Sequence, residues 1–322
     1  MNAVIISLIC ALCWGVADLF YKAGTDENDK HSHLKIAVWV GIAMGIMAIC
    51  CLPMSESHSS ITGLFSKYAV AYSPASLSYI ISMVIGYAGL RYLEISIVSP
   101  VQNASGAFSA IATAVYITVV AKTNLLDDLS VLDIIGTAII TVGIISLGVV
   151  EQKLSKKELD LTGENKKYHF GALALIFPIL YCIFDTIGTY ADGRILDKEH
   201  GGLGLGENDV LILYGLTFFV AGIGCWLFML IRNKKPYNPF KKSEIKKALA
   251  STAEIGGQIF YVYAMAKNAF IAAIVVSSYC IISVILSRIF LKEKLVAKQY
   301  ACVITVILGI VLLGISEGVA EM

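Results

Sequence analysis

The chain has 322 residues, of which 57% are hydrophobic and only 15% are charged, and its formal net charge is +1. This composition is too apolar for a surface that faces water, so the chain is expected to lie in a lipid bilayer. The near-zero charge excludes a general attraction to nucleic acid, and no nucleic-acid partner is predicted.

Ten apolar stretches of about 20 residues, the length that crosses a bilayer as a helix, follow one another along the chain. They predict an all-α integral membrane protein with transmembrane helices at 2–24, 34–53, 73–91, 96–120, 131–150, 168–190, 209–231, 247–267, 270–291 and 297–316. The first stretch is interpreted as a helix and not as a cleaved signal peptide, because it lacks a basic leader and contains Asp18. The longer predicted connections are 54–72, 151–167, 191–208 and 232–246.

The eight cysteines all fall in apolar stretches, where a free thiol behaves as a small hydrophobic side chain, so no disulfide framework is predicted. The five histidines lie in predicted loops or at the ends of helices: His31, His33, His58, His169 and His200. No metal site inside the membrane can be built from them, and neither a metal nor another cofactor is predicted.

Lysine and arginine are distributed unequally between the two faces of the predicted bundle. Of the 25 basic residues, about 20 lie on the face opposite the two termini. Because basic loops stay in the cytoplasm, this distribution predicts a multi-pass protein of the cell membrane with both termini outside.

An internal repeat relates the two halves of the chain. The corresponding pairs are Gly143 and Gly309, Gly148 and Gly314, Trp14 and Tyr181, and Asp18 and Asp185, at offsets of about 166 to 167. We predict an N-terminal five-helix repeat, a charged connecting loop and a C-terminal five-helix repeat at 1–150, 151–167 and 168–322. Since five is odd, the second repeat crosses the membrane in the opposite sense, as in transporters with inverted repeats around a central cavity.

The sequence resembles the drug/metabolite transporter superfamily, and within it the ten-helix EamA-like transporters. The matching segments are Trp14-Gly15, Ala264 through Ala273, Leu291-Lys292-Glu293-Lys294-Leu295 and the Gly309 and Gly314 pattern. The segment from Leu125 to Leu129 in the first half is a degenerate counterpart of the motif at Leu291 to Leu295. The resemblance implies a membrane-embedded cavity and transport without ATP, in agreement with the absence of a Walker-type loop. It also implies cytoplasmic termini, whereas the charge distribution predicts them outside; we follow the charge.

Three acids lie deep in predicted helices, where an ionised side chain costs several kcal/mol and usually serves a function. They are Asp18, Asp185 and Glu254. The depths of Asp18 and Glu254 place them on the same side of the membrane centre, so we expect these two acids to share one site. All three acids are candidates to exchange protons. No lysine or arginine lies at comparable depth, so an electronegative cavity is predicted.

Aromatic residues occur one helical turn from the acids, a pattern that suits a cationic amine through cation–π attraction. Tyr87 and Tyr279 are candidates to complete such a cage. A polar stripe on the fourth stretch either lines the cavity or forms hydrogen bonds between helices: Ser99, Gln102, Asn103, Gly106, Ser109 and Thr113. The predicted substrate-binding residues are Trp14, Asp18, Tyr79, Gln102, Asn103, Tyr181, Asp185, Glu254, Gln258 and Tyr261.

The sequence therefore predicts a secondary transporter of a small polar metabolite, foremost a cationic amine or quaternary ammonium compound, coupled to protons. The alternative is an exporter of amino acids or other neutral metabolites. A membrane-embedded enzyme or receptor is a remote alternative, because neither H-E-x-x-H nor G-x-S-x-G occurs and no catalytic residue is predicted. The expected partners are the small-molecule substrate and the lipid bilayer, and the sequence leaves the oligomeric state open.

Overall fold

The chain folds into a bundle of long helices, and the described residues contain no strand. The structure is a computed structural model that describes residues 2–57, 61–124, 126, 129–162, 174–291 and 296–320. The helices are α1 (Ala3–Gly24), α2 (Ser32–Cys51), α3 (Ile61–Gly89), α4 (Ile95–Val115), α6 (Val131–Thr162), α7 (Ile176–Leu196), α8 (Glu207–Asn233), α9 (Ile245–Lys267), α10 (Ala269–Ser277), α11 (Tyr279–Phe290) and α12 (Ala297–Ala320). Shorter turns are η1 (Leu52–Met54), η2 (Tyr116–Val120) and η4 (Lys242–Glu244).

Within the described residues, seven helical segments are long and apolar enough to cross a bilayer. They are α1, α2 with η1, α3, α4 with η2, the first part of α6, α8, and α10 with α11. Each coincides with a predicted stretch, which supports a multi-pass membrane protein. The other three predicted stretches overlap the helices α7, α9 and α12, and the total of ten transmembrane helices stays a prediction.

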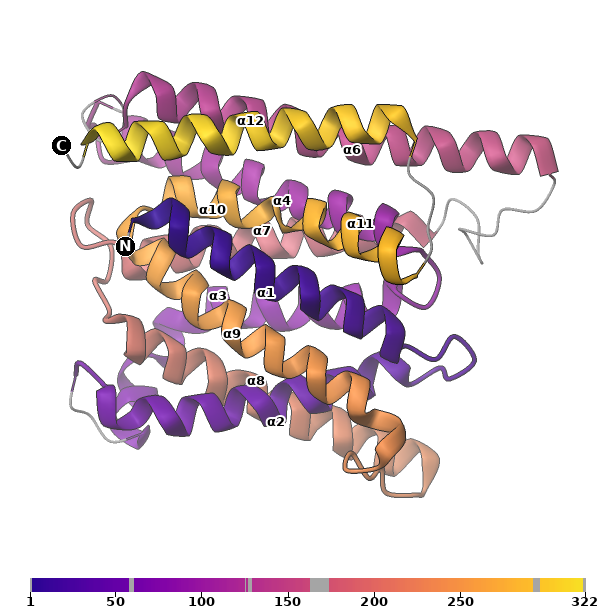
Figure 1. The fold of residues 1–322 in the computed structure, drawn as a ribbon. Helices are drawn as coiled ribbons and strands as arrows, with labels where there is room; N and C mark the ends of the chain where they lie inside the picture. Colours follow the sequence, from indigo (N-terminus) through magenta and orange to yellow (C-terminus); the bar gives the residue numbers. More distant parts are fainter. Residues whose placement is uncertain are drawn as a thin grey trace.

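Two connections predicted as loops are partly helical. α3 begins at Ile61 instead of residue 73, because its first turns bury Leu64 and Tyr72 in the core. α6 continues to Thr162 through a charged segment, since lysine and glutamate are good helix formers once the chain leaves the apolar region. Figure 1 shows this part of α6 extending past the neighbouring helices. The predicted loop at 151–167 is therefore largely helix, and its last residues lie outside the described part.

The helix α7 is displaced along the sequence relative to the sixth predicted stretch. It covers Ile176–Leu196 instead of 168–190, so Asp192 belongs to the helix and not to the following loop. The ninth predicted stretch is divided at Ser278 into α10 and α11. Most of the motif at Leu291 to Leu295 and most of its counterpart at Leu125 to Leu129 lie outside the described residues, as do His58 and His169.

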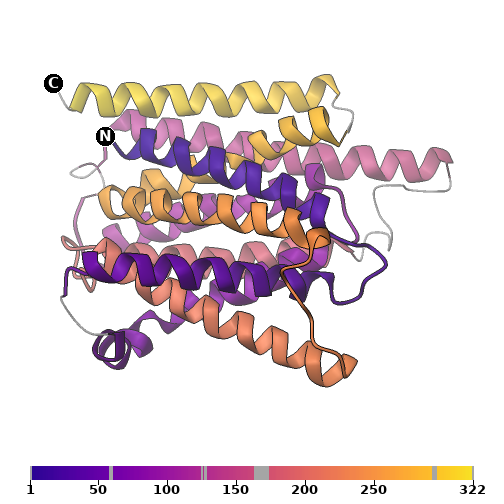
Figure 2. The ribbon, with the colours of Figure 1, turned by 60° about the horizontal axis from the view of Figure 1, so that its bottom comes forward.

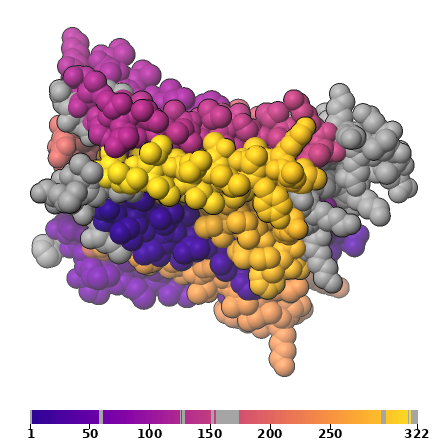
Figure 3. Space-filling view, turned by 45° about the horizontal axis from the view of Figure 1, so that its top comes forward, coloured from indigo at the N-terminus to yellow at the C-terminus, as the bar shows by residue number. Residues whose placement is uncertain are grey.

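Helices from the first part of the chain pack against helices from the second. The most extensive pairs are α1 with α9, α2 with α8, α3 with α7, and α6 with α12. α6 and α12 lie side by side on one face of the molecule (Figures 1 and 3). Gly41 and Gly45 permit the close packing of α2 against α8, because a Cβ on Gly41 would lie 2.8 Å from the Cα of Gly222, and one on Gly45 would lie 2.8 Å from the Phe219 ring.

α1 begins and α12 ends at the same end of the bundle, which we call the terminal end (Figures 1 and 2). The hairpin between α8 and α9, residues 234–244, lies at the opposite end. Large apolar side chains remain exposed on the outer helix faces, among them Val70, Ile231 and Ile289. Such a surface is suited to contact with lipid tails and not with water.

The hairpin at 234–244 is fastened to the bundle by a small polar network. The Lys247 ammonium donates to the Glu244 carboxylate at 2.7 Å, and the Tyr237 hydroxyl donates to the same carboxylate at 2.9 Å. The Trp226 indole N–H donates to the backbone oxygen of Tyr237 at 2.8 Å. Both members of the ion pair are largely buried. The network therefore holds the hairpin against α8 and α9.

We expect acid to loosen this hairpin. Burial by itself would raise the pKa of Glu244, but the hydrogen bonds from Lys247 and Tyr237 lower it below the ordinary value of 4.5. The stabilisation is thus complete above pH 4.5 and is lost as the pH falls through the lower folded value. Fluorescence of Trp226 during acid titration measures the loosening. Glu244→Gln should abolish this transition and Glu199→Gln, at an exposed loop residue, should keep it; an unchanged titration in Glu244→Gln would contradict the assignment.

Candidate functional site

One cavity lies between helices α1, α3, α4, α7, α8, α9, α10 and α11. Its walls include every residue that the sequence predicted for substrate binding: Trp14, Asp18, Tyr79, Gln102, Asn103, Tyr181, Asp185, Glu254, Gln258 and Tyr261. The other lining residues are Tyr21, Met83, Gly86, Tyr87, Leu90, Thr189, Tyr214, Ala273, Val276, Ser277 and Tyr279. The structure thus brings the predicted set together, and its role in binding stays a prediction.

Serine hydroxyls orient two of the three cavity acids. The Asp18 carboxylate on α1 accepts hydrogen bonds from Ser283 of α11 at 2.8 Å and from Ser99 of α4 at 2.9 Å. The Asp185 carboxylate on α7 accepts one from Ser105 of α4 at 2.6 Å. Each donor lies on another helix, so these bonds fix both carboxylates relative to the middle of α4 and to α11.

The third acid, Glu254 on α9, faces the same space and is 7% exposed. Its charge interacts with Asp18 and Asp185, and the Tyr21 hydroxyl lies beside it. No lysine or arginine is among the described residues that line the cavity. Lys22, one turn from Asp18, turns away and donates to the backbone oxygens of Leu90 and Leu93. The cavity is therefore electronegative.

Aromatic rings form much of the remaining wall. The Trp14 ring lies 5.2 Å from the Tyr261 ring and 5.7 Å from the Tyr279 ring. Tyr21 and Tyr87 pair at 4.8 Å. Ring faces close to carboxylates provide both the apolar contact and the negative potential that attract an organic cation.

Some polar groups in the wall have no partner within the described part of the chain. The indole N–H of Trp14 and the amide nitrogen of Gln258 are buried without a hydrogen-bond acceptor. Buried donors that lack a partner are costly, so they are available to an acceptor on a ligand.

The polar stripe of α4 divides between the two roles suggested by the sequence. Gln102 and Asn103 line the cavity, whereas Ser99 forms a hydrogen bond to another helix. Gly106 instead lies at the crossing of α4 and α10, against Ser277. Thr113 lines a separate pocket near the ends of α4 and α7.

Glycines make room for the cavity's aromatic rings. A Cβ on Gly257 would overlap the Trp14 indole, whereas one on the neighbouring Gly256 would meet nothing closer than the Cys13 sulfur at 3.3 Å. We therefore expect Gly257→Ala to displace Trp14 and to weaken substrate binding about tenfold, with a shifted tryptophan emission spectrum. Gly256→Ala is the matched control. Equal effects of both substitutions would show that Trp14 does not depend on this space.

Sequence reasoning missed Tyr21, Thr189 and Tyr214 in the cavity wall, and Asp192 just beyond it. Tyr21 and Thr189 lie three or four residues from Asp18 and Asp185, and this helical spacing is a signal that could have identified them. Tyr214 carries no such signal, because its position depends on how α8 packs. Asp192 was missed because the predicted helix ended at residue 190.

The comparisons with known proteins agree with a membrane-transporter fold. Residues 203–315 match the model of the EamA-like transporter family. No curated protein matches the sequence. Of 18 matching chains of solved structures, one crystal structure of a protein aligns with a TM-score of 0.63 and 10% identity over 98% of each chain. At that identity the likeness shows the fold alone.

Proposed function

Because this chain carries, over residues 203–315, the domain of the EamA-like transporter family, we propose that it is a secondary transporter of a small cationic amine, coupled to protons. EamA family members are membrane transporters of small molecules and not enzymes. The family match does not specify the substrate class, the coupling ion or the direction of transport, so the proposal for these must rest on the residues of the cavity.

The observation that carries the substrate class is the composition of the cavity wall. Three acids face one space that no described lysine or arginine enters, and tryptophan and tyrosine rings surround them. An anionic solute would be repelled there, whereas an ammonium group gains both charge and ring contacts. The wall favours amines, including quaternary ones.

The same arrangement supports proton coupling. Glu254, Asp18 and Asp185 line one cavity, and ionised carboxylates held together away from water are costly. A bound cation can take the place of a proton. The exchange of one for the other, as the cavity opens to each side in turn, would couple the two fluxes.

Alternating access requires two related halves, and the contacts support the predicted inverted repeat. In the predicted repeat, α1 corresponds to α7, α2 to α8, α3 to α9 and α6 to α12. The contact of α1 with α9 therefore has its counterpart in the contact of α7 with α3, whereas the pairs α2 with α8 and α6 with α12 each join corresponding helices. The acids follow the same rule: Asp18 of α1 accepts from a serine of α11, and Asp185 of α7 accepts from a serine of α4. We propose that these halves exchange conformations about the cavity.

The unpartnered donors keep the alternative substrate class open. The Trp14 indole and the Gln258 amide need acceptor oxygens that a simple amine lacks. A hydroxylated amine or the carboxylate of an amino acid would supply one. A zwitterion bound through its amino group is the second candidate.

The experiment is a transport assay on the purified full-length chain in liposomes, with choline-like amines, amino acids and neutral metabolites supplied with and without a pH gradient. Amine transport that depends on the gradient and is lost in Asp18→Asn would support the proposal. Asp26→Asn, at an exposed loop residue, is the matched control. Transport of only neutral or zwitterionic solutes would overturn the cationic class.

The proposed location is the cell membrane, with the basic loops in the cytoplasm and both termini outside. Labelling of single cysteines placed in the 234–244 hairpin of intact cells tests the orientation. Labelling of these cysteines by a reagent added outside the cell would show that the hairpin is extracellular and would reverse the proposed orientation.

A further inference from the structure

A fourth buried acid, Asp192, lies on α7 beyond the wall of the cavity. It is 0% exposed and does not line the cavity, whereas Thr189, one turn earlier on α7, does. The next residue, Gly193, packs against Met265 and Ala269, where α9 ends and α10 begins. Asp192 therefore lies between the cavity and the terminal end of the bundle.

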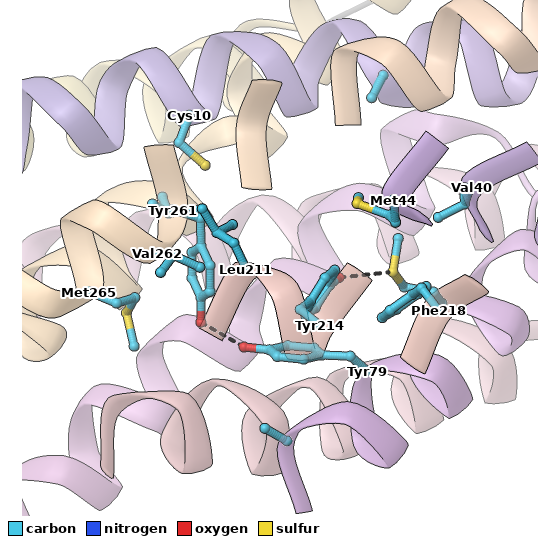
Figure 4. Packing of buried hydrophobic residues seen from close by; sticks show 14 of the residues in the cluster. Cys10, Val40, Met44, Tyr79, Leu211, Tyr214, Phe218, Tyr261, Val262 and Met265 are labelled. Atoms are coloured by element: carbon cyan, nitrogen blue, oxygen red, sulfur yellow. Dashed lines mark hydrogen bonds between the residues drawn. The ribbon is translucent and has the colours of Figure 1, made fainter. Parts of the chain in front are cut away.

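Two tyrosines and Thr189 separate Asp192 from the cavity. The hydroxyls of Tyr79 and Tyr261 are 2.6 Å apart, and the Tyr79 hydroxyl donates to Thr189 at 3.3 Å. Figure 4 shows the two rings pointing toward one another from α3 and α9. This set, which we call the tyrosine gate, joins the helices α3, α7 and α9 within the cavity wall.

The buried Asp192 carboxyl has no hydrogen-bond partner among the described residues. Neither of its oxygens forms a hydrogen bond of normal geometry within the described residues. The groups that act on it are the hydroxyls of Tyr72 and Tyr79 and the charge of Asp185, none of which is a cation. Tyr214 of α8 and Tyr261 of α9 also lie near enough to interact with its charge.

The nearest arginine in the sequence is committed elsewhere. The Arg194 guanidinium binds Asp197, donates to the Tyr116 hydroxyl at 2.8 Å and donates to the backbone oxygen of His200 at 3.1 Å. It also stacks on the Tyr116 ring. The charge of Arg194 is therefore balanced by Asp197 in the loop after α7, and it does not balance a charge on Asp192.

We propose that Asp192 is a proton-binding site of the tyrosine gate: its carboxyl holds a proton while the gate is closed and releases that proton to water when the gate opens. An ionised carboxylate without a cation, beside another acid and out of contact with water, is too costly to persist. On opening, the O–H bond of the acid breaks and water admitted from the terminal end accepts the proton. The site deepens the proposed function, on which its role in coupling rests.

Infrared difference spectroscopy of the purified full-length protein tests the site without any transported solute. We expect wild type at neutral pH to show a protonated-carboxyl band that Asp192→Asn removes. Asp209→Asn is the matched control, because it removes another buried carboxyl, one that accepts hydrogen bonds from the Ser55 hydroxyl and from the backbone N–H of Ser57, and it should leave the Asp192 band in place. A wild-type spectrum from which Asp192→Asn removes no band would overturn the proposal.

The gate itself is tested by exchange of that proton in heavy water. Tyr79→Phe removes the hydroxyl pair, so the Asp192 band should shift about fivefold faster than in wild type. Equal rates would show that the tyrosines do not seal the site. If Asp192→Asn does not fold, wild type with side-chain-labelled aspartate identifies the band. Failure of every solute in the liposome assay would overturn the proposed function and leave these two results unchanged.

Discussion

Glu254→Gln is expected to reduce transport of the cationic solute about 100-fold at neutral pH. Glu254 lies in the cavity with Asp18 and Asp185, and its replacement by a neutral amide would remove one of the three carboxyl groups that face the solute. Truncation of one partner of a buried charge pair commonly costs several kcal/mol, and 2.7 kcal/mol corresponds to about 100-fold. The initial rate of amine-driven current in liposomes measures the loss.

Glu199→Gln, at an exposed loop residue, is the control for Glu254→Gln and should transport as wild type does. The residual transport in Glu254→Gln should no longer respond to a pH gradient, because the exchanging carboxyl is gone. A variant that keeps wild-type rates and the wild-type pH response would remove Glu254 from the coupling mechanism. A variant with a lower transport rate but the wild-type pH response would show that Glu254 contributes to binding only and that another acid carries the coupled proton.

The residues of the cavity wall were predictable from the sequence because their signals are local. An acid in an apolar helix and an aromatic residue one turn away identify a face of a single helix, and that face must point inward in lipid. Asp18 with Trp14, and Asp185 with Tyr181, follow this rule, and the structure places them in one cavity. The prediction needed no knowledge of how the helices pack.

Helix ends were less predictable, and one of them concealed a buried acid. The segment after residue 190 contains glycine, arginine and aspartate, which favour a loop in a single-sequence interpretation. Packing of Gly193 against α9 and α10 instead continues α7 to Leu196 and buries Asp192. Tertiary contacts decided this boundary, and no periodicity along the sequence reports them.

The tyrosine gate was also beyond sequence reasoning. Tyr79 and Tyr261 lie far apart in the chain, and their hydroxyls meet only because α3 and α9 both pack against α7. Gly188 contributes to this meeting, since a Cβ there would lie 2.8 Å from the Tyr79 ring. A small residue on one helix thus places a large one on another, and only the assembled bundle shows which large residue that is.

Gly106→Ala is expected to cause the largest loss of stability, about 3 kcal/mol or more. The glycine lies at the crossing of α4 and α10, where a Cβ would overlap the Ser277 hydroxyl and the backbone oxygen of Ala273. Backbone atoms cannot yield as a flexible side chain does, so the two helices must separate, and overpacking of this kind typically costs 1–3 kcal/mol or more.

The separation would also reach the cavity, because Ser277 lines it and the Ser105 that orients Asp185 precedes Gly106. We therefore expect Gly106→Ala to lower both the unfolding temperature in detergent and the affinity for the transported solute. Gly224→Ala is the matched control: its Cβ would meet nothing within 4 Å, so the same methyl group on α8 should leave both quantities unchanged. An unfolding temperature of Gly106→Ala equal to that of Gly224→Ala would show that α4 and α10 do not meet this closely. A lower temperature with full affinity would instead show that the crossing supports the fold without positioning Asp185.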